Sequence, residues 1–324
     1  MPSPDYSDDY GPRDLVGYGP NPPDARWPNG AKIAIQVVLN YEEGSEATPL
    51  NGDGRSERLA SELGPGCQTL EGTRNVNIES LYEYGSRAGV WRILRLLEEY
   101  GIRCTSYMIG MALLQNPEVG RALVAGGHEV ASHGWRWLDR SAWTVDQEAE
   151  YIRKTVDAIR SVTGQPPRGW YYGMVQSKAG VRSRALVVKT FRELGLPLKY
   201  YSDDYSDDLP HWVAQPGSDG STGLLVVPYA LDTNDYKDGN HNSFLSPDNF
   251  ASYLIGAFDE LYREGVAGRP KMMSMGLHAR LVGRPGRIAG LRKFFEHVKR
   301  HEGVWYATRE EIADHWAEVH PYKP

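Results

Sequence analysis

The stretch KIAIQVVLNYEEG, residues 32–44, decides the fold of this chain. Its first part, Lys32–Leu39, is almost entirely apolar and rich in β-branched residues, which predicts a strand buried on both faces of a parallel sheet. Its second part, Asn40–Gly44, is polar and ends in glycine, which is typical of the loop that follows a strand. Two adjacent carboxylates, Glu42 and Glu43, are therefore predicted at the carboxyl end of a sheet strand.

Short apolar runs alternate with helical stretches along the rest of the chain. Further strands are predicted at Cys104–Ile109, Glu129–Ser132, Gly169–Tyr172, Leu198–Ser202, Leu224–Val227, Met272–Met275 and Val304–Ala307. Helices are predicted at Ile78–Tyr100, Asn116–Gly126, Thr144–Gly164, Arg184–Leu194, Ser246–Gly265, Ile288–Arg300 and from Thr308 onward. Seven or eight such alternations predict an α/β fold whose parallel sheet is closed, or nearly closed, into a barrel.

The length of 324 residues suits either two domains or one large barrel. We expect an extended N-terminal arm over residues 1–30 and a single barrel domain over residues 31–324. The arm is rich in Pro, Gly, Asp and Tyr and lacks the basic and apolar regions of a secretory signal. Because no apolar run is long enough to span a membrane, we expect a cytoplasmic protein without membrane association.

Charge and cysteine content exclude several classes of function. Lys plus Arg number 36 against 42 for Asp plus Glu, so the net charge of −6 argues against nucleic-acid binding. Two cysteines cannot build a disulfide scaffold or a cysteine-based zinc module. No glycine-rich phosphate loop follows a predicted strand, which argues against nucleotide binding. Any chemistry must therefore come from histidines and carboxylates.

Titratable side chains follow three different predicted strands. Glu42 and Glu43 follow the first, His133 follows Glu129–Ser132, and His278 follows Met272–Met275. In extended backbone one of the two glutamates should point into the barrel mouth and the other away. A buried carboxylate can take a proton from water, His278 can protonate a departing nitrogen, and His133 can serve as metal ligand, oxyanion stabiliser or second base. A solvated acid pair and structural histidines are the alternatives.

Ordered motifs link the chain to a known superfamily. They are Arg13–Gly19, Leu39–Gly44, Glu79–Arg87, Ser132–Trp137, Asp207–Pro210, Leu231–Asp235 and Gly276–His278. In these motifs the chain, from about Tyr10 to Tyr322, resembles the polysaccharide deacetylase (NodB-homology) superfamily, and more closely its allantoinase branch of cyclic amide and imide hydrolases. The resemblance implies a distorted (β/α) barrel, often of seven strands, and hydrolysis of a C–N amide bond.

Departures from the superfamily pattern bear on metal binding. Glu42 and Glu43 stand where ordinary deacetylases have two aspartates, and Trp137 replaces the second histidine of the motif that begins at His133. An indole ring offers no lone pair to a metal, so Glu43 and His133 are the inherited ligands if a metal is present. Catalytic zinc usually has three protein ligands, so either another group such as His278 completes the set or no metal is tightly bound. We favour a site without a cofactor and keep zinc as the alternative.

A second departure bears on the substrate. Met174 stands where the allantoinase branch leads us to expect an arginine after the Gly-Trp-Tyr-x-Gly segment. A guanidinium can clamp a ureido or imide carbonyl, and methionine cannot. Either allantoin is not the substrate, or Arg136, Arg168 or Arg280 makes the contact instead.

These observations predict an amidohydrolase that opens a small cyclic amide, such as a hydantoin or imide, with water. Glu42 or Glu43 would activate the water, His133 would hold the water or the oxyanion, and His278 would protonate the ring nitrogen. The expected substrate-binding residues are Tyr41, Trp135, Trp137, Trp170 and Tyr171 as an aromatic wall, with Glu79, Arg87, Arg136 and Arg280 as polar contacts. For Glu79 and Arg87 a helix-surface ion pair is the alternative. We expect a small-molecule substrate and a homo-oligomer, either dimer or tetramer.

Two other functions compete with this one. The first is a metal-dependent N-deacetylase acting on an acetylated sugar polymer, against which the lost second histidine and the missing export signal count. The second is a binding protein on the same fold without activity. That protein would not need to keep Glu42, Glu43 and His278.

Overall fold

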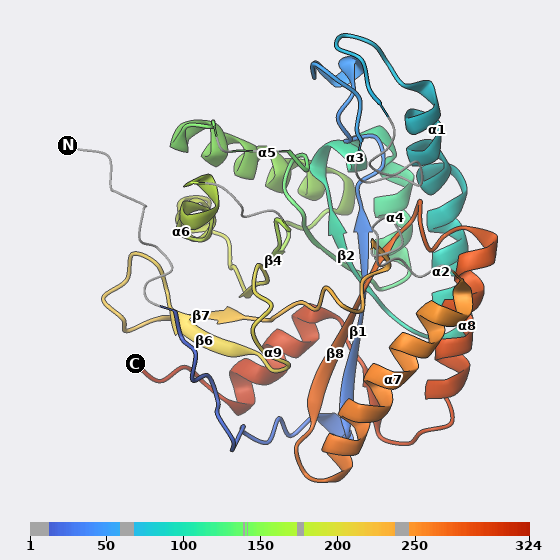
Figure 1. Cartoon of the computed structure of the whole chain (residues 1–324). Coiled ribbons are helices and arrows are strands. Elements are labelled where there is room, and N and C mark those ends of the chain that lie inside the picture. Colours follow the sequence, from blue (N-terminus) through green and yellow to red (C-terminus); the bar gives the residue numbers. More distant parts are fainter. Residues whose placement is uncertain (1–12, 59–67, 139, 141, 174–177, 237–245) are drawn as a thin grey trace.

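The structure confirms an α/β fold with a curled sheet (Figure 1). It is a computed structural model that describes residues 13–58, 68–138, 140, 142–173, 178–236 and 246–324. Within these residues nine strands form one sheet in the order β6-β7-β5-β4-β3-β2-β1-β8, and β9 pairs with β1. All neighbouring strands are parallel except β6 and β7, which form an antiparallel pair at one edge.

The strands lie close to their predicted positions. They are β1 (Ile33–Tyr41), β2 (Thr105–Met108), β3 (Glu129–Ser132), β4 (Gly169–Trp170), β5 (Tyr200–Tyr201), β6 (His211–Ala214), β7 (Gly223–Val226), β8 (Lys271–His278) and β9 (Val304–Tyr306). Strand β6 was not predicted, because its half-exposed residues give no apolar run. Strand β8 extends to His278, three residues beyond the predicted end.

Helices flank the sheet. They are α1 (Val76–Tyr84), α2 (Val90–Tyr100), α3 (Gly110–Gln115), α4 (Pro117–Ala125), α5 (Val145–Thr163), α6 (Lys178–Glu193), α7 (Pro247–Val266), α8 (Pro285–Val298) and α9 (Arg309–Val319). Capping boxes at Thr144 with Gln147 and at Thr308 with Glu311 start α5 and α9 at the predicted residues. Figure 1 shows α2, α7 and α8 together on one flank of β1 and β8.

The long helix predicted at Ile78–Tyr100 contains a π-helical turn, Gly85–Gly89, between α1 and α2. Its two glycines pack where side chains would not fit. A Cβ atom at Gly89 would collide with the carbonyl oxygen of Ala279, and one at Gly85 would collide with the side chain of Glu43. The turn therefore brings helix backbone directly against the loop after β8 and the end of β1.

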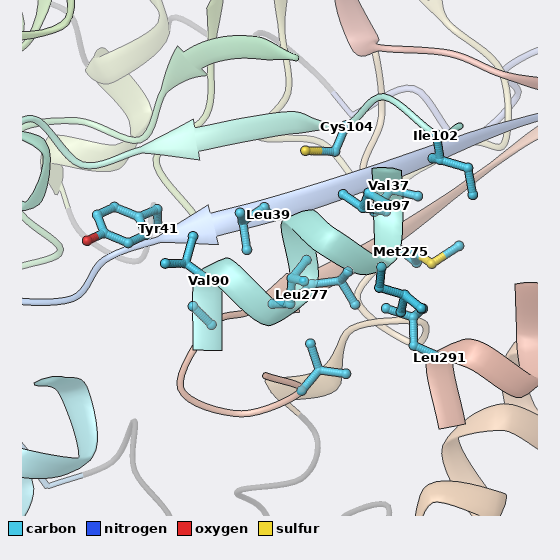
Figure 2. Close-up of a cluster of buried hydrophobic side chains, with 14 of the residues drawn as sticks. Val37, Leu39, Tyr41, Val90, Leu97, Ile102, Cys104, Met275, Leu277 and Leu291 are labelled. Atoms are coloured by element: carbon cyan, nitrogen blue, oxygen red, sulfur yellow. The ribbon is translucent and has the colours of Figure 1, made fainter. Parts of the chain in front are cut away.

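Strand β1 separates two apolar layers, and all nine of its residues are buried. Val37, Leu39 and Tyr41 point to the side covered by α2 and α8 (Figure 2). Val38 belongs to the opposite layer, which fills the inside of the curled sheet together with tyrosines such as Tyr107. This alternation, carried forward by one step, directs Glu42 to the inside.

The curled sheet is completed by an irregular segment. Asn234, beyond the end of β7, forms an isolated parallel bridge with Gly276 of β8. Nearby, the backbone amide of Ala230 donates to the hydroxyl of Ser274, 2.9 Å away. The sheet is therefore a distorted barrel, in which loop backbone takes the place of a regular strand pair between β7 and β8.

The described part of the predicted arm, residues 13–30, lies against the barrel. The indole of Trp27 is buried and donates to the backbone oxygen of Lys271 at 3.0 Å. The hydroxyl of Tyr18 donates to the backbone oxygen of Pro210 at 2.6 Å. None of the described helices is both long enough and apolar enough to cross a membrane.

Candidate active site

The two adjacent glutamates after β1 face in different directions, as the alternation predicts. Oε1 of Glu42 lies 3.2 Å from Nε2 of His133 and 3.8 Å from Nε2 of His278. Glu43 instead accepts hydrogen bonds from the backbone amides of Arg280, at 3.1 Å, and of Glu42, at 3.0 Å. Glu42 therefore meets the two histidines, and Glu43 fastens the loop after β8 to the end of β1.

The guanidinium of Arg280 lies between the two carboxylates. Its Nη1 is 2.8 Å from Oε2 of Glu42 and 3.7 Å from Oε1 of Glu43. The same guanidinium stacks 4.5 Å above the ring of Tyr82, and the arginine is buried. Sequence reasoning expected Arg280 to contact substrate, whereas the structure uses it to hold one oxygen of Glu42 and leave the other toward the histidines.

The charges around the glutamates separate their proton affinities. Burial alone would raise the pKa of Glu42, but the positive charges of Arg280 and of the nearby histidines outweigh it and lower that pKa far below its usual range. For Glu43 burial prevails and, together with the charge on Glu42, raises the pKa. Glu42 is therefore ionised at neutral pH, with Oε1 turned toward the two histidines.

Each histidine is oriented by a hydrogen bond at Nδ1. In His133 this atom lies 3.1 Å from the backbone oxygen of Tyr171, which can only accept. In His278 it lies 2.7 Å from Oδ1 of the fully buried Asp235. Both Nδ1 atoms must therefore carry the proton, and both Nε2 atoms face Glu42.

Asp235 is a site residue that sequence reasoning did not select. Besides His278 Nδ1, it accepts hydrogen bonds from the backbone amides of His278, at 2.8 Å, and of Val282, at 3.1 Å. Its position in the motif Leu231–Asp235 was a usable signal, since the carboxylate there lies between two predicted strands that are consecutive in the chain, the second of which leads into His278.

Only part of the predicted aromatic wall faces the site. The ring of Tyr171 stacks on His133 with centroids 5.1 Å apart, and it also contacts the rings of Tyr107, at 4.7 Å, and Tyr229, at 4.9 Å. Trp137 packs edge-on against Tyr236 at 6.4 Å, and Tyr236 lies 5.7 Å from the ring of His278. Aromatic rings therefore stand beside both histidines.

The other three predicted wall residues point elsewhere. Tyr41 bonds to the hydroxyl of Ser86 at 2.8 Å, on the helix side of β1. Trp170 lies in the apolar cluster against α6, and Trp135 packs under Lys154 of α5. For Tyr41 and Trp170 the reason is the two-residue period of a strand, because Glu42 and Tyr171 occupy the inward positions next to them.

The remaining predicted polar contacts hold loops or face solvent. Arg136 binds Asp53 at 2.6 Å and so ties down the loop after β1. Glu79 is bound by Arg74 at 2.6 Å, and the side chain of Arg87 is 79% exposed. Arg87 lies 3.8 Å from Glu83 in a helix-surface ion pair, which was the alternative interpretation. Met174 lies outside the described residues.

One buried polar atom near the site lacks a partner. Asn40 donates through Nδ2 to the hydroxyl of Tyr229 at 3.2 Å, and Asn234 donates to the same hydroxyl at 3.0 Å. Oδ1 of Asn40 has no hydrogen-bond partner among the described residues, although Asn40 is only 1% exposed. An unsatisfied acceptor at this depth is a natural contact for a ligand N–H group.

Glu43 and His133, the metal ligands that the resemblance implies, are not arranged to bind the same ion. Glu43 gives both oxygens to backbone amides, and His133 faces Glu42 instead of Glu43. Trp137 has no lone pair, and Arg280 already supplies a positive charge between the two carboxylates. Glu43 and His133 therefore do not converge on a common ion.

Comparisons with known proteins agree with the fold and the motifs. Residues 73–189 match the polysaccharide deacetylase family. A putative polysaccharide deacetylase from Schizosaccharomyces pombe is 44% identical over 322 residues, which cover 97% of this chain and 99% of that protein. A crystal structure of a probable polysaccharide deacetylase from Pseudomonas aeruginosa has a TM-score of 0.88 and 47% identity, covering 96% of this chain and 100% of its own.

The structure of PuuE allantoinase is equally similar. It has a TM-score of 0.88 and 47% identity, and it covers 96% of this chain and 99% of its own. Sequence identity at this level over nearly the whole length of each protein confirms the resemblance drawn from the motifs. The chain belongs to the polysaccharide deacetylase (NodB-homology) family of hydrolases.

Proposed function

We propose that this protein opens a small cyclic amide, an allantoin-like hydantoin or imide, by attack of water on the ring carbonyl. One observation carries the proposal: a single oxygen of Glu42 faces Nε2 of His133 and Nε2 of His278, and Asp235 backs the second histidine. The proposed base, Glu42, and the proposed acid, His278, thus lie close enough to act on the same substrate carbonyl and its nitrogen. Similarity to PuuE allantoinase supports the choice of a cyclic substrate.

In the first step Glu42 Oε1 takes a proton from water, and the water oxygen bonds to the ring carbonyl carbon. Arg280 binds the other carboxylate oxygen of Glu42, Oε2, at 2.8 Å, so only Oε1 is available to act as the base. The carbonyl oxygen becomes an oxyanion, and His133, protonated at Nε2, donates to it.

In the second step the ring C–N bond breaks. Nε2 of His278 gives its proton to the leaving nitrogen, and Asp235 at Nδ1 stabilises the imidazolium before transfer. The product is an open chain with a new carboxyl group and a new N–H. The proton that Glu42 took from water then passes to His278, whose Nε2 is 3.8 Å from Oε1, and both groups regain their starting protonation states.

Contacts around this centre suit a small planar ring. The unpartnered Oδ1 of Asn40 would accept a hydrogen bond from a ring N–H, and Tyr171 and Trp137 would flank the ring faces. No step of this mechanism is routed through a metal. Arg280 compensates the charge of Glu42, and the N–H of His133 stabilises the oxyanion. Members of the polysaccharide deacetylase family are typically metal-dependent. A divalent ion in this site would have to be held by Glu42, His133 and His278, because Glu43 is turned away from the histidines.

The second candidate is a metal-dependent N-deacetylase acting on an acetylated sugar polymer. The name of the Schizosaccharomyces pombe relative, a putative polysaccharide deacetylase, favours it. The two candidates release different products, acetate from a polymer and an opened ring from a cyclic amide.

A single panel of substrates separates them. Purified protein is incubated with allantoin, hydantoin, dihydrouracil, succinimide and an acetylated chito-oligomer, and ring opening and acetate are measured separately. We expect ring opening of at least one cyclic amide and no acetate, with Glu42→Gln inactive as the control for contaminating enzymes. Acetate release without ring opening contradicts the proposal. Full activity after chelation, with less than stoichiometric metal, is expected for the mechanism above.

A further inference from the structure

We propose a divalent-metal site between helices α7 and α8, separate from the strand ends that carry Glu42. Asp259 of α7, His297 in the last turn of α8 and His301 just beyond it each offer one ligand atom. These three atoms all lie within 4.8 Å of one another. The inference does not depend on the proposed function, because none of the three residues takes part in it.

The hydrogen bonds of the three side chains prepare them for an ion. Nε2 of His297 lies 2.7 Å from Oδ1 of Asp259. Nδ1 of His301 lies 3.1 Å from the backbone oxygen of His297 and must donate to it, which leaves Nε2 of His301 with its lone pair. A backbone carbonyl that fixes the tautomer of a histidine in this way is the usual support of a metal-binding imidazole.

Aromatic side chains of α7 orient both imidazoles. Phe258 meets the ring of His297 edge-on with centroids 5.8 Å apart and the ring of His301 at 5.0 Å. Tyr262, one turn further along α7, packs edge-on against His301, also at 5.0 Å. The side chains of His297 and Asp259 are 25% and 50% exposed, so an ion can reach them from solvent without a buried route.

The donor set selects the kind of metal. Two imidazole nitrogens and one carboxylate oxygen suit Zn²⁺, Co²⁺ or Ni²⁺, whereas Ca²⁺ and Mg²⁺ prefer oxygen ligands alone. Bonds of about 2.0–2.1 Å to zinc place neighbouring ligand atoms roughly 3.3 Å apart. Small rotations of these partly exposed side chains bring them that close, and water completes the coordination.

A bound ion would join two helices that pack on the same strand. Phe258 of α7 and Phe294 of α8 are fully buried in the layer that also contains Leu277 of β8. In Figure 1, α7 and α8 lie side by side along β8. The ion would therefore stabilise the layer behind the strand that ends at His278, and its effect would appear in thermal stability.

Cobalt titration of the chelator-treated full chain tests the site. Co²⁺ bound to two histidines and a carboxylate gives visible absorption, and its intensity counts the ions bound. We expect His301→Ala to bind one Co²⁺ fewer than the unaltered protein. Asp259→Asn should lower the affinity for the same Co²⁺ ion by more than the roughly 10- to 100-fold typical of a lost outer-shell partner. Zn²⁺ should raise the melting temperature of the unaltered protein by about 2–4 °C, and should not do so in His301→Ala.

A matched control lies on the same two helices. Asp248 of α7 forms an exposed ion pair with Lys293 of α8 and does not belong to the cluster of Asp259 and the two histidines. Asp248→Asn should leave the number of bound Co²⁺ ions and the zinc effect unchanged. The proposal is overturned if no Co²⁺ binds, if His301→Ala binds as many ions as the unaltered protein, or if Asp248→Asn weakens binding as much as Asp259→Asn. Loss of the only bound ion in His133→Ala, with binding retained in His301→Ala, also overturns it.

Discussion

The guanidinium of Arg280 lies 2.8 Å from Oε2 of Glu42, although the arginine side chain is only 2% exposed. A buried ion pair of this kind is costly to form, and removing one partner alone leaves an uncompensated buried charge. Here the cation serves two carboxylates, since Glu43 lies 3.7 Å from the same Nη1. The pair therefore links the stability of the barrel mouth to the protonation state of the candidate base.

Arg280→Met should destabilise the protein by about 3–5 kcal/mol at neutral pH, because it leaves Glu42 buried without its closest cation. The free energy of unfolding from urea titration measures this loss. In the double variant Glu42→Gln with Arg280→Met, part of the loss should be recovered, since the unpaired charge is gone. A loss below about 1 kcal/mol in the single variant would show that the pair does not stabilise the site.

Asp235→Asn should lower turnover of any hydrolysed substrate by about 10²- to 10⁴-fold. It should also cost stability, because an amide NH2 cannot accept from the backbone amides of His278 and Val282. An amide can offer its oxygen to His278 Nδ1 but cannot stabilise the imidazolium as a carboxylate does. The matched control is Asp232→Asn in the same segment, where Asp232 accepts from the exposed Tyr253 at 3.1 Å. Equal activity of the two variants would remove Asp235 from the mechanism.

Glu46→Gln should change the free energy of unfolding more favourably at about pH 8 than at about pH 5. Burial raises the pKa of Glu46 to about 7. Folding therefore takes up a proton between the ordinary carboxyl range and pH 7, and this contribution to stability is lost as the pH rises through 7. The amide in the variant has no proton to lose, so the difference in unfolding free energy between the variant and the unaltered protein should grow with pH, by up to about 3 kcal/mol. A difference independent of pH would contradict the raised pKa.

Gly89→Ala should destabilise the protein by several kcal/mol or prevent folding, because the added methyl group would collide with the backbone oxygen of Ala279. Gly256→Ala in α7 is the control, since no atom of the described residues lies within 4 Å of its Cβ position. It should be neutral or stabilise by roughly 0.5–1 kcal/mol, the usual gain of alanine over glycine in a helix. Thermal unfolding measures both, and similar melting temperatures would rule out close contact at the π turn.

Local signals in the sequence predicted much of the fold and part of the site. Apolar runs such as Lys32–Leu39 and capping pairs such as Thr144 with Gln147 act over a few residues, so the chain displays them directly. The opposite directions of Glu42 and Glu43 followed from strand alternation in the same way.

The sequence did not predict side-chain directions and partners that depend on the exact strand register or on a contact between distant residues. Trp170 and Tyr171 are neighbours, and only an exact strand position tells which of them faces inward. The roles of Arg280 and Asp235 depend on partners brought together by the closed sheet, Arg280 on Glu42 and Asp235 on His278. No short-range pattern marks such pairs, and π turns such as Gly85–Gly89 depend on what packs against them.

The pairing of β1 has a consequence for the order of synthesis and folding. Its first residues, Ile33–Ile35, pair with β9, which begins at Val304, and residues Ile33–Asn40 pair with β8. The strand that leads into Glu42 leaves the ribosome long before β8 and β9, so it gains these partners late. A nascent fragment that stops before β8 therefore has neither a finished β1 nor His278, and the candidate site forms only after β8 and β9 have been released.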